Sequence, residues 1–268
     1  MSTHSPSACY NCGATLQGRF CVVCGQEDRP LDPTVREVAG EFARELSDLD
    51  GRILRSVRHL FFSPGLLTKE HFRGRRASWI SPVRLYLVFS VAYFAILSLT
   101  GLPPLNFNFQ VTRETDEESK QAVQELGFSS EEEIRTTANE ALVTWIPRAM
   151  FVLIPLFAWL VSRVRRKSGH QYPHHLIFSL HLFAAFFAVL AIGVGVSYLA
   201  RNEIVSGVIG LGSIVFVVIY MMLALKVVYG GTSIRALIHT AVVLSAYWLA
   251  TIVVTGAIIA PVLFWRRR

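Results

Sequence analysis

Charged residues are scarce in this sequence, and acids almost vanish from its second half. Only 17% of the 268 residues are charged, against about 25% in ordinary soluble domains. Beyond residue 140 the single acid is Glu203, and long apolar runs are interrupted only by short basic clusters. This pattern is typical of a chain embedded in a bilayer. It argues against an ion channel or a proton pump lined by charge.

The sequence also lacks the usual signatures of exported and catalytic proteins. The first residues, MSTHSPSACYNC, contain no apolar stretch, so we expect no cleavable signal peptide. No P-loop, G-x-S-x-G, H-E-x-x-H or dinucleotide-binding fingerprint is present, and we therefore expect no enzymatic activity. The net charge of +7 does not indicate a nucleic-acid partner, because the bases lie beside the apolar runs, where they meet lipid headgroups.

Five apolar segments are each long enough to cross a bilayer, which takes about 20 residues. Trp and Tyr residues occur near several of their ends, as in the aromatic belts of membrane proteins. The sequence thus predicts an all-α membrane protein whose residues 83–268 form a transmembrane helical bundle. The predicted spans are 83–101, 144–161, 176–199, 204–225 and 237–264.

Charges beside the spans predict how the chain is inserted. Bases precede the first span and crowd between the second and the third, whereas the loop 102–143 is rich in acids. The positive-inside rule then places the N-terminus in the cytoplasm and the acidic loop 102–143 outside. Five spans put the C-terminus outside as well, although the chain ends in three arginines, so the side of the C-terminus stays open.

The four cysteines form two C-x2-C pairs separated by eight residues: Cys9, Cys12, Cys21 and Cys24. Two such pairs present four thiolates to one ion, which is the donor set of a structural zinc site. We predict a zinc ribbon over residues 1–30, with Zn²⁺ as a structural cofactor that supplies most of its folding free energy. Two disulfides, an iron–sulfur cluster and a redox-active C-x2-C are the alternatives. Disulfides fit poorly with a cytoplasmic location, and a thioredoxin-like motif lacks its strand–helix context.

Residues 31–82 are predicted to form an amphipathic helical region. Thr34 and Glu37 fit a capping box, and apolar residues follow at spacings of three and four, as on one face of a helix. A short second helix is expected to follow, with Pro64 in its first turn and Gly74 at its end.

This region is also strongly basic, with eight bases and one acid, Glu70, between residues 52 and 84. A basic, amphipathic segment next to a span is typical of helices on the membrane surface. We expect it to lie on the cytoplasmic surface and to bind anionic lipids through Arg73, Arg75, Arg76 and Arg84. A soluble helical hairpin packed on the ribbon is the alternative.

Two kinds of residue stand out within the predicted spans. Histidines gather near the start of the third span and at the fifth, and one interpretation is a metal, haem or proton-relay site. The favoured interpretation is that they face lipid headgroups, with His181 hydrogen-bonded inside the bundle, because no carboxylate lies nearby in sequence. Glycines of the third and fourth spans are expected to allow close helix packing. The residues are His174, His175, His181 and His239, and Gly193, Gly195, Gly207, Gly210 and Gly212.

Four stretches together resemble one uncharacterised bacterial membrane-protein family, a domain of unknown function with an N-terminal zinc ribbon. They are CYNCGATLQGRFCVVCGQ, HLFFSPGLLTKEHFRGRRASWISPVRLYLVFS, YPHHLIFSLHLFAAFF and IYMMLALKVVYGGTSIRALI. The more specific parts are Pro64-Gly65, Gly74-Arg75-Arg76 and the block that runs from Pro82 to Tyr86. The resemblance implies a location in the bacterial inner membrane and carries no activity.

Three functions are compatible with these observations. The first is a membrane-anchored scaffold or regulatory protein whose ribbon and basic helices recruit a cytoplasmic protein, contact anionic lipid or assemble with a second copy. The second is a small-molecule transporter formed by the bundle. The third is an intramembrane metal-dependent enzyme that uses the histidines. A polar cavity at mid-membrane depth would favour transport, convergent histidines would favour the enzyme, and a dry bundle would favour the scaffold.

Overall fold

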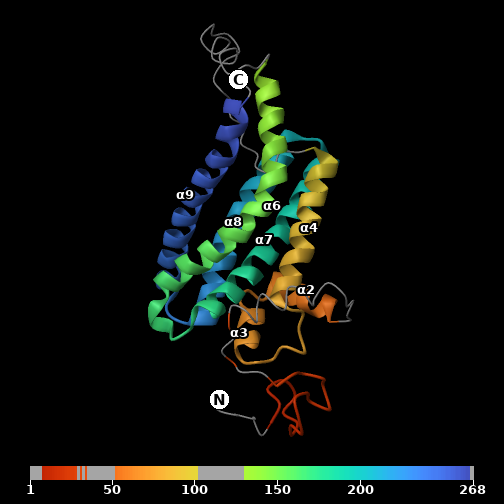
Figure 1. Ribbon diagram of the computed structural model, residues 1–268, viewed down its shortest axis with the longest axis vertical. Coiled ribbons are helices and arrows are strands. Elements are labelled where there is room, and N and C mark those ends of the chain that lie inside the picture. Colours follow the sequence, from red (N-terminus) through yellow and green to blue (C-terminus); the bar gives the residue numbers. More distant parts are fainter. Residues whose placement is uncertain (1–7, 29–30, 32–33, 35–51, 102–129, 266–268) are drawn as a thin grey trace.

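The computed structural model describes residues 8–28, 31, 34, 52–101 and 130–265, and the statements below concern these residues. The predicted helix that follows Thr34 and Glu37 lies mostly outside them, as does most of the acidic loop 102–143. Within the described part, the chain consists of a small cysteine-bearing ribbon, two short helices and five long helices (Figure 1).

The ribbon consists of two similar knuckles. Isolated antiparallel bridges pair Ala8 with Thr15 and Phe20 with Glu27, and each bridge encloses one C-x2-C turn. Gly13 and Gly25 follow the second cysteine of each pair with φ angles of 77° and 71°. These left-handed angles are easily reached by glycine and explain its place in both turns.

Two short helices connect the ribbon to the bundle. Helix α2 covers Ile53–Phe62 and helix α3 covers Leu66–Phe72. The predicted start of α3 is wrong by two residues, because Pro64 precedes the helix and Gly65, with a φ of 80°, is its N-cap. The predicted end is close, since Gly74 follows the last turn with a φ of 79°.

Five helices are long and apolar enough to cross a membrane, which confirms the predicted number of spans. The second begins earlier than predicted, because Ser130 caps it by accepting a hydrogen bond from the backbone N–H of Glu133 at 3.2 Å. A polar first section therefore extends this helix beyond the apolar segment. The helices are α4 (Pro82–Thr100), α6 (Glu131–Val164), α7 (Tyr172–Ala200), α8 (Glu203–Tyr229) and α9 (Ser233–Trp265).

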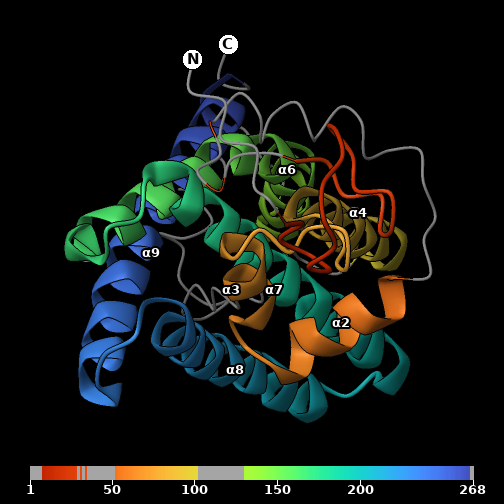
Figure 2. The ribbon, with the colours of Figure 1, turned by 90° about the horizontal axis from the view of Figure 1, so that it is seen from below.

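Helix α7 is the centre of the bundle (Figures 1 and 2). It packs against α4, α6 and α8, and α9 joins α6 to α8. Helices α6, α7, α8 and α9 thus form a closed ring, with α4 on the outer side of α7. Within the apolar window of each helix, 67% of the residues of α7 are buried but only 6% of those of α9, so α9 lies at the periphery of the bundle.

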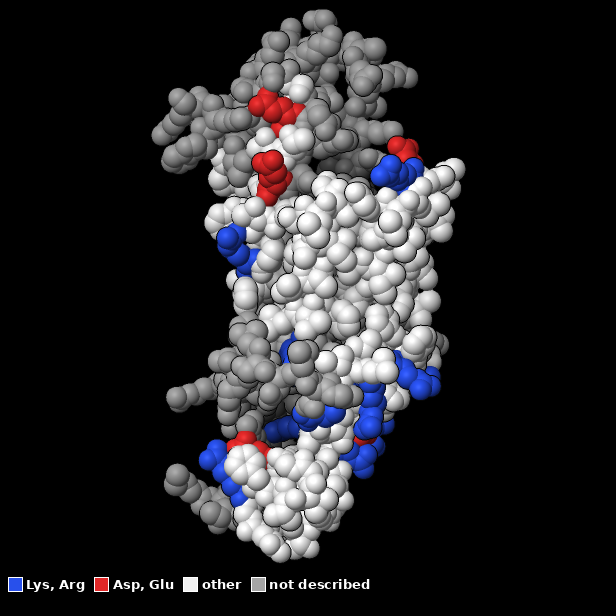
Figure 3. All heavy atoms as spheres, turned by 90° about the vertical axis from the view of Figure 1, so that its right-hand side faces the viewer, with Lys and Arg blue, Asp and Glu red and all other residues white. Residues whose placement is uncertain are grey.

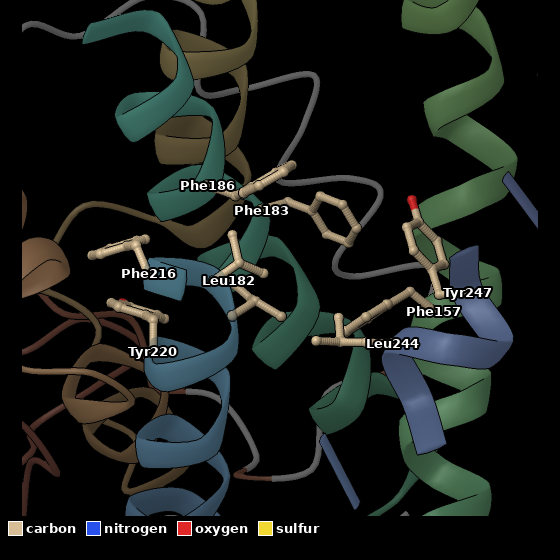
Figure 4. A pocket seen from close by; sticks show the side chains of 9 residues that line it. Phe157, Leu182, Phe183, Phe186, Phe216, Tyr220, Leu244 and Tyr247 are labelled. Atoms are coloured by element: carbon tan, nitrogen blue, oxygen red, sulfur yellow. The ribbon is translucent and has the colours of Figure 1, made fainter. Parts of the chain in front are cut away.

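The interior of this ring is lined by aromatic side chains (Figure 4). The wall of a cavity of about 100 Å³ has one ring each from α6 and α9 and two each from α7 and α8: Phe157, Tyr247, Phe183, Phe186, Phe216 and Tyr220. The Phe157 ring meets those of Phe183 and Tyr247 edge-on, at centroid distances of 5.2 and 5.1 Å. A lining made almost entirely of apolar atoms disfavours water in this cavity.

Close packing through glycine occurs at one of the five predicted positions. A Cβ on Gly193 would come within 2.9 Å of the Ile209 side chain, so α7 and α8 approach closely there. The expectation is wrong for the other four, because a Cβ on any of them would meet no atom within 4 Å. These are Gly195, Gly207, Gly210 and Gly212.

One end of the bundle, which we call the ribbon end, carries the ribbon, α2 and α3 (Figure 1). Helices α4, α7 and α9 begin there, and α6 and α8 end there. The α6–α7 and α8–α9 connections therefore lie beside α3.

Candidate metal centre and its junction with the bundle

The four cysteine thiols converge on one point. Their sulfur atoms all lie within 4.8 Å of one another, and this is the only group of metal-ligating side chains found in the described residues. The Sγ atoms of Cys9 and Cys24 are 3.6 Å apart, as are those of Cys12 and Cys21. Each short distance joins the two knuckles, so the sulfurs hold the knuckles together.

Backbone hydrogen bonds shape the turns that carry these thiols, and the pKa values of Cys12 and Cys21 move in opposite directions, that of Cys12 being raised to about 12. In each knuckle the first cysteine carbonyl accepts a 2.8 Å hydrogen bond from the glycine N–H that follows the second cysteine. This closes the turn around the sulfurs. Backbone N–H groups of Cys24 and Val23 lower the pKa of the Cys21 thiol to about 6. A thiolate is therefore favoured at this position, and thiolates are the form that binds metal.

The geometry fits one tetrahedral ion. Zn–S bonds of about 2.3 Å place thiolates about 3.8 Å apart at the corners of a tetrahedron, close to the distances between the knuckles. Disulfides require sulfurs about 2 Å apart, and all four cysteines are free. The four cysteines can thus hold a metal ion with protein ligands at every position, which leaves none for substrate or water.

Gln26 attaches this ribbon to the bundle. It is buried, and its Nε2 donates to the Gly74 carbonyl at 2.8 Å. Its Oε1 accepts from the backbone N–H groups of Arg76 and Ala77, both at 3.0 Å. One side chain therefore binds three backbone groups of the segment after α3.

The first knuckle contacts the same segment. Ser78 donates from its Oγ to Asn11 Oδ1 at 2.7 Å. A Cβ on Gly74 would come within 2.7 Å of Leu31 and 3.1 Å of Tyr10, so the ribbon lies directly against this glycine. Both knuckles thus rest on one short segment, residues 73–80, which we call the junction.

Glu70 holds the junction against α3. It is 6% exposed, and its two oxygens each accept from one arginine at 2.9 Å, Oε1 from Arg73 and Oε2 from Arg75. Two of the four arginines predicted to bind lipid are therefore engaged by a buried carboxylate. The lipid contact itself stays a prediction. The sequence contained a signal for this site, since Glu70 is the only acid among eight bases, but it did not reveal the pairing.

Helix α3 is inserted among the ends of the long helices. A Cβ on Gly65 would come within 2.9 Å of the Ala224 carbonyl, so α3 touches the backbone of α8. Thr68 Oγ1 lies 3.0 Å from Nδ1 of His181 in α7. Tyr220 of α8 donates to the Leu60 carbonyl of α2 at 2.7 Å. Both short helices are thus fixed to the bundle by buried contacts that the sequence did not indicate.

The histidines of the third span are buried under α3. His174, His175 and His181 are 5%, 1% and 5% exposed, so the expectation that this group faces lipid headgroups is wrong. His174 meets the Phe72 ring at 4.8 Å, and His175 Nδ1 lies 2.8 Å from the Tyr229 hydroxyl. The expected hydrogen bond of His181 is present, with Thr68 as its partner.

His239 lies apart from these three, where its Nδ1 accepts from Arg165 at 3.0 Å. The four histidines of the speculative polar site therefore occupy different contacts. Within the described part of the chain, they do not form a metal-binding group.

Charge is distributed unequally along the bundle. Figure 3 shows most Lys and Arg side chains near the ribbon end, a middle belt almost free of charge and acids at the opposite end. The acids at that end follow from the sequence, because α6 begins with three consecutive glutamates at 131–133 and α8 begins with Glu203.

Comparison with known proteins finds one family whose sequence model matches part of the chain. Residues 50–94 match the sequence model of a family described as Protein of unknown function (DUF3667). The match covers α2, α3, the junction and the first two thirds of α4, and it confirms the resemblance to an uncharacterised family. No curated protein and no solved structure matches the chain.

Proposed function

We propose that this protein is a membrane-anchored scaffold of the bacterial inner membrane that presents a zinc ribbon to a protein partner in the cytoplasm. The observation that carries the proposal is the attachment of the ribbon through Gln26 and Asn11. A flexible tether would make no such contacts. A ribbon held in one orientation suits a binding surface, because preorganisation lowers the entropy cost of binding.

Zinc is the metal that suits this site best. Four thiolates at tetrahedral spacing match structural zinc, and closed coordination suits a structural role. The orientation follows from the bases, since a ribbon end rich in Lys and Arg belongs in the cytoplasm under the positive-inside rule. A reducing cytoplasm also keeps the four thiols free.

The second knuckle offers the contact surface. Val22 and Val23 are 74% and 69% exposed, and Phe20 beside them is 55% exposed. Apolar side chains at the tip of a fixed module are typical of protein interaction sites. We infer that the partner buries this tip.

The bundle supports the scaffold over the alternatives. Aromatic and aliphatic side chains line the cavity inside the ring, which does not suit transport of a polar solute. The histidines lie in separate contacts, which does not suit an intramembrane metal enzyme.

Site-specific photocrosslinking of the full-length protein in cells tests this function. A crosslinker at Val22 should give one discrete protein adduct, whereas the matched position Gln17, also exposed on the ribbon, should not. The adduct should disappear when Cys9 and Cys21 are both changed to Ser. Adducts with lipid alone, or equal adducts at both positions, would overturn the proposal.

A further inference from the structure

A buried guanidinium at the ribbon end draws together three elements of the ring. Arg165 follows the last residue of α6 and is 8% exposed. It donates from Nη1 to His239 Nδ1 at 3.0 Å and from Nη2 to the Gly230 carbonyl at 2.8 Å. Its guanidinium also lies 5.1 Å from the centre of the Tyr229 ring. These contacts use two of its five N–H donors.

No carboxylate neutralises this charge within the described part of the chain. Burial lowers the pKa of Arg165; among its neighbours, Tyr229 raises this pKa and the positive charge of Arg235 lowers it. A further base, Lys226, lies in the last turn of α8, and its Nζ donates to the Oγ of Ser233 at the start of α9, at 3.0 Å. Burying a cation without a counter-charge is costly, so the site has an electrostatic demand for an anion.

The start of α9 adds to this demand. Its first turn is capped by Thr232, whose Oγ1 accepts from the backbone N–H of Arg235 at 3.3 Å. The N-terminus of a helix of this length carries a partial positive charge and favours anions. Three positive groups therefore lie at this end of the bundle: Arg165, the exposed Arg235 and the partial charge at the N-terminus of α9.

Apolar residues beside the arginines indicate an amphiphilic ligand. Ile234 and Ile238 flank Arg235 on α9 and are 72% and 55% exposed. The site also lies where α6 and α8 end and α9 begins, which is the depth of lipid phosphates if the bundle spans the membrane. A phospholipid whose headgroup phosphate binds the arginines would place its acyl chains against the two isoleucines.

We propose that Arg165, Arg235 and the first turn of α9 form a binding site for the phosphate of an anionic phospholipid headgroup. This inference rests on the membrane location in the proposed function and does not depend on the partner of the ribbon. It assigns specific lipid binding to a different place from the arginines expected from the sequence, because Arg73 and Arg75 pair with Glu70.

Lipid binding to the full-length protein in detergent tests the site, with phosphatidylglycerol and phosphatidylcholine as probes in native mass spectrometry. The wild-type protein should bind phosphatidylglycerol more tightly. Arg235→Gln should weaken that binding by about tenfold, the usual effect of losing one charge-assisted hydrogen bond. Arg235 is exposed, so its removal should leave the fold intact.

Arg58→Gln is the matched control, since it removes one exposed positive charge at the same end of the bundle, on α2 and away from α9. Its binding should stay within about twofold of wild type. Equal losses in both variants, or no preference between the two lipids, would overturn the proposal, because binding would then be diffuse. Displacement of the lipid by inorganic phosphate would also overturn it, since the ligand would then be a soluble anion.

The double change of Cys9 and Cys21 to Ser separates this proposal from the function of the ribbon. It should abolish the ribbon crosslink and leave phosphatidylglycerol binding unchanged. Loss of lipid binding in that variant would contradict an independent site at α9.

Discussion

The ribbon with its junction and the ring of long helices are stabilised in different ways. At the junction, single side chains such as Gln26 and Glu70 each satisfy several partners at hydrogen-bonding distance. In the ring, aromatic side chains pack around an apolar cavity. Burying apolar surface drives folding in water, but it contributes little between helices already surrounded by lipid. Polar pairing thus dominates at the junction, whereas apolar packing dominates inside the ring and hydrogen bonds such as that of Arg165 to His239 occur at its end.

Removing metal ligands should give the largest difference in stability between the ribbon and the ring. Changing both Cys9 and Cys21 to Ser removes two thiolates, and a metal site of this kind contributes on the order of 10 kcal/mol to folding. Hydrogen exchange should become fast over residues 8–28 and stay slow in α7. Unchanged protection in the ribbon would show that it folds without metal.

A substitution at Gly65 tests how much the contact between α3 and α8 contributes to stability. Ala at this position has an unfavourable left-handed φ and a Cβ 2.9 Å from the Ala224 carbonyl, so we expect a loss of about 3 kcal/mol in thermal unfolding. Gly101→Ala is the control, because it has a similar φ of 65° and no atom within 4 Å. Equal losses in both variants would mean that contact between α3 and α8 adds nothing.

Gln26 tests the attachment of the ribbon. Gln26→Leu removes three hydrogen bonds between the ribbon and the junction and should destabilise the docked state by about 2 kcal/mol. Exchange should then accelerate at Arg76 and Ala77 while the ribbon keeps its metal. Gln17→Leu, an exposed change on the same ribbon, should have no such effect. Simultaneous loss of the metal would show that folding and docking of the ribbon are one process.

The smallest effect is a pH dependence that arises in α3, beside the junction. Burial, with the nearby Arg76, His181 and His174, lowers the pKa of His71 well below its ordinary value of 6.5. The unfolded chain therefore binds a proton before the folded one, so stability is full above pH 6.5 and declines below it. We expect a loss of about 1 kcal/mol at pH 5.5, measured by thermal unfolding. His71→Asn should reduce the loss, and an unchanged pH profile would exclude His71 as its source.

Much of the architecture was predictable because it depends on local properties of the sequence. Helix number follows from the length of each apolar run, and the metal centre follows from the spacing of Cys9, Cys12, Cys21 and Cys24. The capping of α6 by Ser130 was also readable from its neighbours. In each case the residues concerned lie within one turn or one segment.

The errors concern the direction in which side chains point. The glycines of α7 and α8 differ only in the face of the helix that carries them, and Gly193 alone meets the neighbouring helix. His174 looked interfacial, since it lies near the end of an apolar run, but α3 covers it. An apolar helix in lipid has no polar face, so its sequence does not reveal which side is buried.

The sequence by itself determined five spans, a four-cysteine centre and an excess of bases at one end of the chain's membrane segments. Tertiary structure alone decided which charges are paired, as Arg73 and Arg75 are with Glu70, and which have no carboxylate partner among the described residues, as Arg165. Gln26 meets Gly74 across 48 residues, and Tyr220 meets Leu60 across 160. Apolar length and metal-ligand spacing act over a few residues, whereas such contacts form only when distant segments are packed together.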